Sequence, residues 1–370
     1  MPPLPRLPLI GNTLVVNEDS CNLGCAYCLT GRNNLTRGQA LASVLDPPER
    51  DRYTPSSGLG RRIDRIAGRL RGHFDLPLLK VTGGEAFLVR GIMDFLEEQS
   101  AYHEVLVIQT NGVLISEEQL ARLRSWGNAV LQISLDSHLH PGNSYRVRSR
   151  LLHRTVVEAV TRMLDSGLPV EVHCVLNDRS VVELDEFAAW LAGFATPPTL
   201  FPFPVRGTGS GPFKVRPEQV RHIEELAGRH RRYRHILPPL PYFDRLLDFC
   251  RRGGRAFRCH LPRLVVSTFS DGVITPCPNI WFTDVGNALA RDADRSLAGL
   301  GTSGLYRELL APSPRVDACH DCFTPWDTLS LYFEDEITLD QLCAAPTYAP
   351  PRVRELIRAA KATYRRGAGE

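Results

Sequence analysis

Residues 21–28 read CNLGCAYC and place Cys21, Cys25 and Cys28 in one short segment near the N-terminus. Thiolates at this spacing can bind three of the four irons of a [4Fe–4S] cluster, which leaves the fourth iron open for a substrate or cofactor. A structural zinc site is the alternative. Closed zinc sites usually have four ligands, often as two C-x2-C pairs, and this segment supplies only three cysteines.

A second set of four cysteines lies in the last third of the chain: Cys259, Cys277, Cys319 and Cys322. A β-hairpin is predicted between the first two, with strands at 263–269 and 273–275 and Gly272 at the turn. Four thiolates beside a hairpin suit either a zinc ribbon or a cluster without an open iron. The other three cysteines, Cys174, Cys250 and Cys343, are expected to be small buried side chains.

The composition is that of an ordinary globular protein. With 370 residues, 43% of them hydrophobic, the chain can bury a large core without disulfides. A net charge of +3 gives no reason to expect a nucleic-acid partner. The N-terminus lacks the pattern of a signal peptide, and no stretch reaches about 18 apolar residues, so we expect a cytoplasmic protein without a membrane segment. Ten cysteines in a reducing compartment then indicate metal binding or catalysis.

Short apolar runs alternate with amphipathic patterns over the first two thirds of the chain. The predicted strands are 13–16, 78–82, 105–110, 129–135, 170–176 and 199–205, and the predicted helices are 61–71, 88–99, 117–126, 152–166, 182–194 and 217–233. This alternation predicts an α/β fold, a partial (β/α)6 TIM-like barrel with its site at the carboxyl ends of the strands. A loop is expected at 45–60 and a helical tail from about residue 351.

The segment C-x3-C-x-Φ-C, with Tyr27 as the aromatic residue Φ, resembles the signature of the radical S-adenosylmethionine (SAM) enzymes. KVTGGEAFL, at residues 80–88, resembles their GGE element. The resemblance implies that Gly83, Gly84 and Glu85 bind the amino group of SAM. The alternative for the glycine pair is a simple turn.

The same resemblance implies further cofactor contacts, each at a strand end or after one. Ser134 would contact SAM, and Arg146 would pair with its carboxylate; a solvent-facing strand end and a surface arginine are the alternatives. Asn111 and Leu176 lie in the segments TNG and CVLN, which would line the pocket unless they are plain turns.

The second cysteine set resembles the twitch half of a SPASM domain, which implies one auxiliary [4Fe–4S] cluster bound by all four thiolates. A complete SPASM domain would need more cysteines after Cys322, and only Cys343 follows. The predicted organisation is therefore a partial barrel at 1–240, a small β-hairpin and helix domain for the auxiliary cluster at 241–345, and a helical tail at 346–370.

The activity implied by the resemblance starts with an electron from a reductant such as a flavodoxin or ferredoxin. SAM is cleaved to methionine and a 5′-deoxyadenosyl radical, which takes a hydrogen atom from an unactivated carbon. We expect a natural-product type of small polar metabolite, an amino sugar, cyclitol or nucleoside, that is oxidised or epimerised. In an epimerase, Cys174 or Cys250 could return the hydrogen atom.

Three other functions remain open. A maturase that crosslinks or epimerises a ribosomally made peptide is the closest, although only twenty residues precede Cys21 and no leader-recognition domain is expected. The others are a zinc-binding module and an iron–sulfur electron carrier. Basic runs at 229–235 and 251–260 could meet an anionic substrate or form a solvated face, and the glycine-rich segment 204–211 could shape the pocket or be a flexible loop.

Metal analysis separates the cluster and zinc interpretations. After anaerobic reconstitution with iron and sulfide, the chain should hold about eight iron atoms, four for each cluster, with a matching amount of sulfide. Stoichiometric zinc that iron does not replace would contradict both cluster assignments.

Overall fold

The computed structural model describes residues 7–18, 20–28, 51–207, 210–280 and 283–368. Six parallel strands lie side by side in the order β1-β3-β5-β6-β7-β8. They are β1 (Gly11–Val15), β3 (Leu78–Thr82), β5 (Val105–Thr110), β6 (Ala129–Ser134), β7 (Val170–Leu176) and β8 (Thr199–Pro204). The α/β fold with a partial barrel is confirmed. Both ends of each predicted barrel strand lie within two residues of the observed ends.

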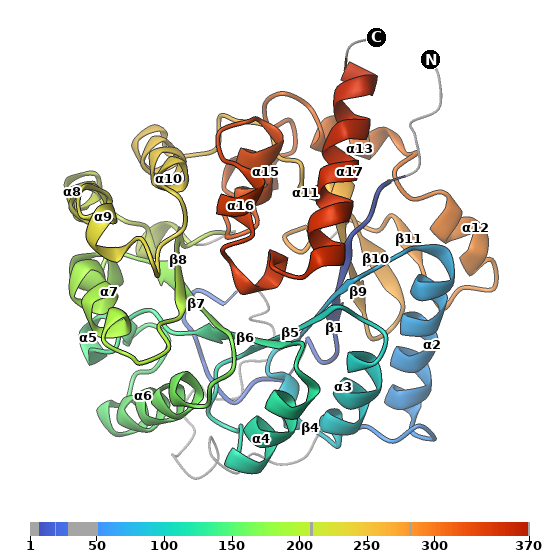
Figure 1. The fold of residues 1–370 in the computed structure, drawn as a ribbon, viewed down its shortest axis with the longest axis horizontal. Coiled ribbons are helices and arrows are strands. Elements are labelled where there is room, and N and C mark those ends of the chain that lie inside the picture. The colour runs from blue at the N-terminus through green and yellow to red at the C-terminus, as the bar shows by residue number, and fades with distance from the viewer. Residues whose placement is uncertain (1–6, 19, 29–50, 208–209, 281–282, 369–370) are drawn as a thin grey trace.

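Helices cover the outer side of this curved sheet (Figure 1). They are α2 (Gly58–His73), α3 (Ile92–Ser100), α4 (Glu117–Trp126), α6 (Arg150–Asp165), α7 (Leu184–Ala192) and α8 (Val220–Gly228). A capping box formed by Ser116 and Gln119 starts α4. The predicted helix at 217–233 is divided into a 3-10 turn (Pro217–Gln219), α8 and α9 (His230–Tyr233).

Part of the predicted loop at 45–60 is ordered secondary structure, so that prediction is wrong for residues 51–60. β2 (Asp51–Arg52) pairs in parallel with β4 (Val89–Arg90), and α2 begins at Gly58. Residues 45–50 lie outside the described part of the chain. Short α5 (His140–Asn143) follows β6.

The barrel sheet does not close, because β1 pairs with the later strand β9 instead of β8. The predicted hairpin is present as β9 (Val265–Phe269) and β10 (Val273–Thr275). The chain turns between them at Gly272, whose φ is 91°. With β11 (Gly286–Asn287) it extends the barrel sheet to nine strands. The division at residue 240 therefore stays a prediction, since the two parts share one sheet.

The rest of the C-terminal part is helical and packs beside the barrel (Figure 1). Its helices are α10 (Leu240–Arg252), α11 (Leu261–Leu264), α12 (Ala293–Ala298), α13 (Gly304–Leu309), α14 (Asp317–His320), α15 (Asp327–Phe333), α16 (Leu339–Leu342) and α17 (Pro351–Ala368). The tail helix begins at the predicted residue. Among the described residues, no helix is both long and apolar enough to span a bilayer.

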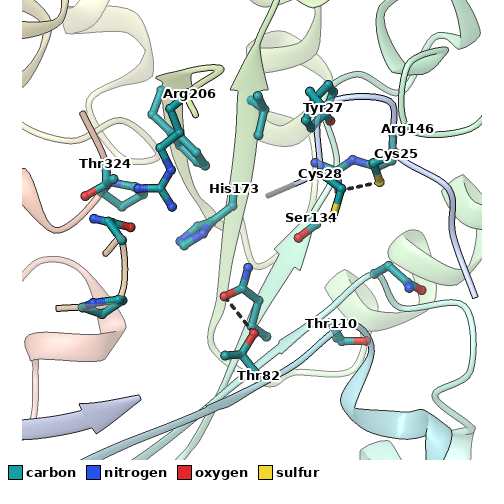
Figure 2. A pocket seen from close by; sticks show the side chains of 18 of the residues that line it. Cys25, Tyr27, Cys28, Thr82, Thr110, Ser134, Arg146, His173, Arg206 and Thr324 are labelled. Atoms are coloured by element: carbon teal, nitrogen blue, oxygen red, sulfur yellow. Dashed lines mark hydrogen bonds between the residues drawn. The ribbon is translucent and has the colours of Figure 1, made fainter. Parts of the chain in front are cut away.

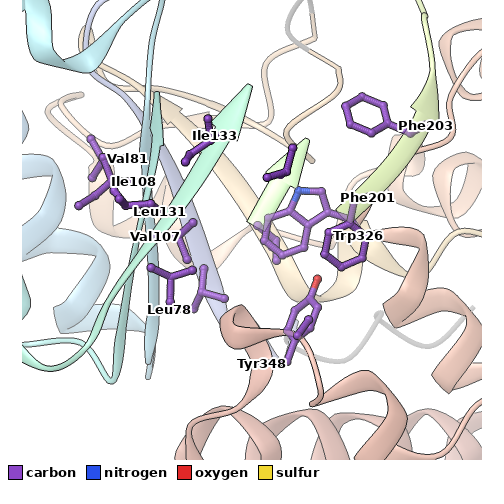
Figure 3. Packing of buried hydrophobic residues seen from close by; sticks show 14 of the residues in the cluster. Leu78, Val81, Val107, Ile108, Leu131, Ile133, Phe201, Phe203, Trp326 and Tyr348 are labelled. Carbon is purple, nitrogen blue, oxygen red and sulfur yellow. The ribbon is translucent and has the colours of Figure 1, made fainter. Parts of the chain in front are cut away.

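Side chains alternate between the two faces of the barrel strands. Val81, Ile108 and Leu131 lie on the outer face and are buried in the core (Figure 3). The inner face carries polar residues instead: the register pairs Lys80 with Thr13, and Gln132 with Glu171. Trp326 and Tyr348 pack near the inner side of the strands (Figure 3). These polar side chains indicate that the inside of the barrel is a binding site as well as part of the packed core.

A buried ion pair attaches the second cysteine set to the rest of the fold. Arg255 donates from Nη1 and Nη2 to both carboxylate oxygens of Asp327, each at 2.7 Å, and from Nε to the carbonyl of Cys322 at 2.8 Å. Asp327 also accepts from the amide of Thr324 at 2.8 Å. The two charged side chains are only 2% and 3% exposed.

Replacement of Arg255 by Met should lower the free energy of unfolding by about 3–5 kcal/mol, because it leaves the Asp327 carboxylate buried without its partner. Arg252→Met is the matched control, since Arg252 pairs with Asp248 at the surface and is 64% exposed. The control should change stability by less than about 1 kcal/mol. Denaturant unfolding measures both, and equal losses would contradict the role of the buried pair.

Candidate active site

A cavity of about 220 Å³ lies at the carboxyl ends of the barrel strands (Figure 2). Segment 21–28, which follows β1, forms one wall, and residues at the ends of β3, β5, β6, β7 and β8 form the middle. The far wall comes from residues 278–279, directly after Cys277, and from residues 324–326, which begin two positions after Cys322. The cavity therefore extends from the first cysteine set to the sequence neighbours of the second.

Cys21, Cys25 and Cys28 all line this cavity, as the sequence predicts for ligands of a cluster with an open iron. Burial raises the pKa of the Cys21 thiol well above its usual value and that of Cys25 to about 12. The neighbouring thiols raise the pKa of Cys21 further. A group of mutually repelling buried thiolates needs a positive partner, and the irons of a cluster supply one.

The GGE element packs directly against the cysteine segment. Gly84 donates its amide to the carbonyl of Asn17 at 2.8 Å, and Glu85 donates to the carbonyl of Ser20 at 2.9 Å. A Cβ on Gly84 would lie 2.0 Å from the Ser20 carbonyl oxygen, and one on Gly83 would lie 2.1 Å from Oδ1 of Asn17. The glycines are therefore needed for this backbone contact, a role that the sequence prediction did not include.

Glu85 connects the ends of β3 and β5. Its carboxylate accepts from Oγ1 of Thr110 at 2.8 Å and from the amide of Asn111 at 2.8 Å. Nδ2 of Asn111 in turn donates to Oδ1 of Asn22 at 2.7 Å and lies 4.0 Å from Sγ of Cys21. Burial raises the pKa of Glu85, and these hydrogen bonds oppose the shift. Direct contact of Glu85 and Asn111 with SAM stays a prediction, but both hold the loop that carries Cys21.

Arg146 is 8% exposed, so the alternative of a surface arginine is wrong. It donates to Asp136 at 2.8 Å, and its other terminal nitrogen lies 3.8 Å from Sγ of Cys25 (Figure 2). Tyr27 donates its hydroxyl to the same carboxylate. Burial lowers the pKa of Arg146, but Asp136, Tyr27 and Cys25 together outweigh it and hold that pKa well above its usual value. Nε of Arg146 is buried without a partner and could bind an anion.

Sequence reasoning missed Asp136, although this carboxylate organises the wall. It accepts from Arg146, from Tyr27 and from the amide of Val175 at 3.0 Å. Its position directly after a buried strand was the available signal, because polar residues at that edge face the site. Ser134, the last residue of β6, lines the cavity as predicted.

Three residues predicted for the site do not reach the cavity. On β7, His173 and Val175 line it, so Cys174 and Leu176 point to the other face of the sheet. Cys174 is fully buried and donates to the carbonyl of Asp136 at 3.3 Å. Cys250 lies on α10, away from the lining residues. Neither thiol is placed to return a hydrogen atom to a substrate in the cavity.

The four cysteines of the second set lie close together. Burial raises the pKa values of Cys259, Cys277 and Cys319, and charge on Cys322 raises each of them further. Within the described residues, no three His, Cys, Asp or Glu side chains converge on one metal ion. Each ligand of a [4Fe–4S] cluster binds a different iron, so both cysteine sets fit clusters better than a single zinc ion.

Neither basic run lines the cavity. In the run at 251–260, each arginine contacts an acidic side chain or a phenol of the protein: Arg251 with Glu224, Arg252 with Asp248, Arg255 with Asp327 and Arg258 with Tyr364. In the run at 229–235, Arg229 pairs with Asp185, and Arg231, Arg232 and Arg234 are exposed. The arginines at 251–260 are thus engaged within the protein, whereas an anionic partner at 229–235 stays a prediction.

The glycine-rich segment after β8 contributes to the pocket. Pro204, Val205 and Arg206 line the cavity, whereas residues 208 and 209 lie outside the described part of the chain. Asp321, between Cys319 and Cys322, accepts from the amide of Gly207 at 3.2 Å. The barrel loop is thus tied to the second cysteine set.

Comparisons with known proteins agree with this geometry. Residues 19–191 match the family model of the Radical SAM superfamily. The GTP 3′,8-cyclase of Helicobacter pylori is 26% identical over 176 residues, which is 45% of this chain and 49% of that protein. The GTP 3′,8-cyclase of Paenarthrobacter nicotinovorans is 30% identical over 181 residues, 46% of this chain and 45% of that one. The chain thus matches about half the length of these curated relatives.

Solved structures share the fold at low sequence identity. Streptococcus suis SuiB bound to S-adenosylmethionine superposes with a TM-score of 0.56 at 15% identity, over 81% of this chain and 67% of that one. A structure of anSMEcpe with bound AdoMet gives a TM-score of 0.56 at 14% identity, over 95% of this chain and 98% of that one. These likenesses support the fold.

Gly84→Ala tests the contact between the GGE element and the cysteine segment. Because the new methyl group would overlap the Ser20 carbonyl, the first cluster should be lost while the auxiliary cluster stays, so iron content should fall by about half. Gly72→Ala is the control, since a Cβ there meets nothing within 4 Å. Iron and sulfide analysis measures both variants. A fully loaded Gly84→Ala protein would contradict the packing role.

Proposed function

We propose that this chain, a radical SAM enzyme whose superfamily domain spans residues 19–191, cleaves SAM reductively and oxidises a small polar metabolite. The observation that carries the proposal is the cavity lined by the first cysteine set on one wall and, on the opposite wall, by residues 278–279 and 324–326, which lie next to Cys277 and Cys322 in the sequence. Substrate bound there would lie between the SAM end of the barrel and the auxiliary cysteines.

The residues of the first wall suit the binding of a cluster and SAM. Cys21, Cys25 and Cys28 would hold a [4Fe–4S] cluster, with Arg146 and Ser134 facing the space beside it. When bound there, such a cluster supplies the electron that cleaves SAM to methionine and a 5′-deoxyadenosyl radical. Phe203 and Trp326 give the cavity apolar walls, which would exclude water from the reacting atoms.

The far wall favours oxidation over epimerisation. Cys259, Cys277, Cys319 and Cys322 would hold an auxiliary cluster, which can accept an electron from the substrate. An epimerase of the kind considered from the sequence needs a thiol that returns a hydrogen atom, and neither Cys174 nor Cys250 lines the cavity. Dehydrogenation or another net oxidation is therefore the reaction class that we propose. A flavodoxin or ferredoxin would supply the electrons.

The relatives leave two substrate classes to consider. The curated ones are named for a nucleotide substrate, GTP, which belongs to the class of small polar metabolites. A peptide maturase is the second candidate, because SuiB has also been solved bound to the precursor peptide SuiA. That likeness is at 14% identity and supports the fold alone, so we rank the metabolite first.

Anaerobic incubation with dithionite and SAM tests the proposed activity. The wild-type protein should form methionine and 5′-deoxyadenosine, and Cys25→Ala should abolish both products because one ligand of the first cluster is lost. Cys322→Ala should still cleave SAM slowly but should not convert substrate. Cys343→Ala is the control and should behave as wild type, since this buried thiol lies in neither set. Chromatography with mass spectrometry detects the products, and a cluster-loaded wild type that forms no 5′-deoxyadenosine would contradict the proposal.

A further inference from the structure

The half of the cavity next to the second cysteine set carries cations without carboxylate partners. Lys80, from β3, is 5% exposed, and its only recorded contact among the described residues is with the Trp326 ring, 5.7 Å from Nζ to the centroid. Arg206, just after β8, places Nη1 3.8 Å from Sγ of Cys322. No ion pair joins either cation to a carboxylate in the described part of the chain, and both line the cavity.

The acidic side chains nearby are already engaged. Glu171 accepts from Nε2 of Gln132 at 2.7 Å and from the amide of Thr347 at 2.9 Å. Glu85 and Asp136 hold the first wall through the contacts described above. Glu171 raises the pKa of Lys80 electrostatically, although no ion pair joins the two among the described residues. Lys80 and Arg206 therefore line the cavity without a carboxylate ion pair in that part of the chain.

His173 lies between Arg206 and the first wall (Figure 2). It is 6% exposed and lines the cavity, and its Nε2 is buried without a hydrogen-bond partner. Burial lowers the pKa of this imidazole well below its usual value, and the charges of Lys80 and Arg206 lower it further. A neutral imidazole still offers one N–H donor.

A buried cation without a partner is costly, and the cost is visible at Lys80. Burial lowers its pKa to about 7; Glu171 opposes this shift and Arg206 adds to it. A bound anion would compensate both charges and would accept hydrogen bonds from up to three donors. Such an anion would also favour the protonated form of Lys80.

We propose that Lys80, His173 and Arg206 form an anion subsite that binds a carboxylate or phosphate group of the substrate. This inference deepens the proposed function and rests on it for the identity of the ligand as substrate. In Figure 2, Arg206 and Thr324 lie across the cavity from Cys25 and Arg146. The anionic end of the substrate then points toward the auxiliary cysteines, and the rest of the substrate extends toward the first wall, which segment 21–28 forms.

The subsite changes the expected substrate. Amino sugars and cyclitols without an acidic group, both considered from the sequence, would leave Lys80 and Arg206 without an anionic partner from the substrate. Acidic or phosphorylated metabolites compensate them. The anionic group also provides a fixed point that orients the carbon to be attacked.

Calorimetric titration of the cluster-loaded protein tests the subsite without turnover. Inorganic phosphate, pyrophosphate and malonate are titrated separately, with and without saturating SAM. At least one should bind in the presence of SAM, and preference for a phosphate or for malonate tells which acid the substrate carries. Lys80→Met and Arg206→Met should each weaken that binding about tenfold or more. Arg154→Met, which removes an exposed arginine on α6, should leave the affinity unchanged.

Lys80→Arg keeps the charge and should bind the anion within a few-fold of wild type, which separates loss of charge from loss of folding. Iron and sulfide content verifies that each variant is loaded. Three results would overturn the subsite: no anion binds, Arg154→Met weakens binding as much as the cavity variants, or SAM displaces the anion and so claims the cations for its own carboxylate. Formation of 5′-deoxyadenosine is a separate readout, so failure of the anion site and failure of the proposed SAM chemistry are distinguishable.

Discussion

The site depends on a backbone contact between two loops that follow neighbouring strands. Gly84 and Glu85 donate amides to the carbonyls of Asn17 and Ser20, so the cysteine segment is held by the end of β3. Side chains at Gly83 or Gly84 would separate the loops. The GGE element is thus as much a structural support for the thiols as a candidate cofactor contact, and Glu85 extends that support to β5 through Asn111.

A second constraint is the alternation of side chains along buried strands. His173 and Val175 face the cavity, and therefore Cys174 and Leu176 cannot. Both kinds of residue are buried, so hydrophobicity alone does not reveal which face is inside the barrel. The absence of Cys174 from the cavity matters for chemistry, because it moves the proposed reaction from epimerisation toward oxidation.

Buried charge distinguishes the two ends of the cavity. At the first wall, the positive charge of Arg146 is compensated by Asp136 and lies near Cys25. At the far wall, Lys80 and Arg206 form no ion pair with a carboxylate among the described residues. The first arrangement is complete within the protein, and the second requires a ligand or a cluster to balance it. This asymmetry gives the substrate a direction in the barrel.

The amino-acid sequence by itself determined the six β/α units, the hairpin at Gly272 and the two cysteine sets, because strand periodicity, turn residues and ligand spacing are local properties. It also placed Ser134 and Arg146 near the site. Tertiary structure alone decided which face of β7 lines the cavity, that Asp136 joins Tyr27 to Arg146, and that Arg206 lies beside Cys322 and lines the same cavity as Lys80. Those contacts join residues that are far apart in the chain. The pKa values and charges of these residues depend on burial, which a local sequence pattern does not show.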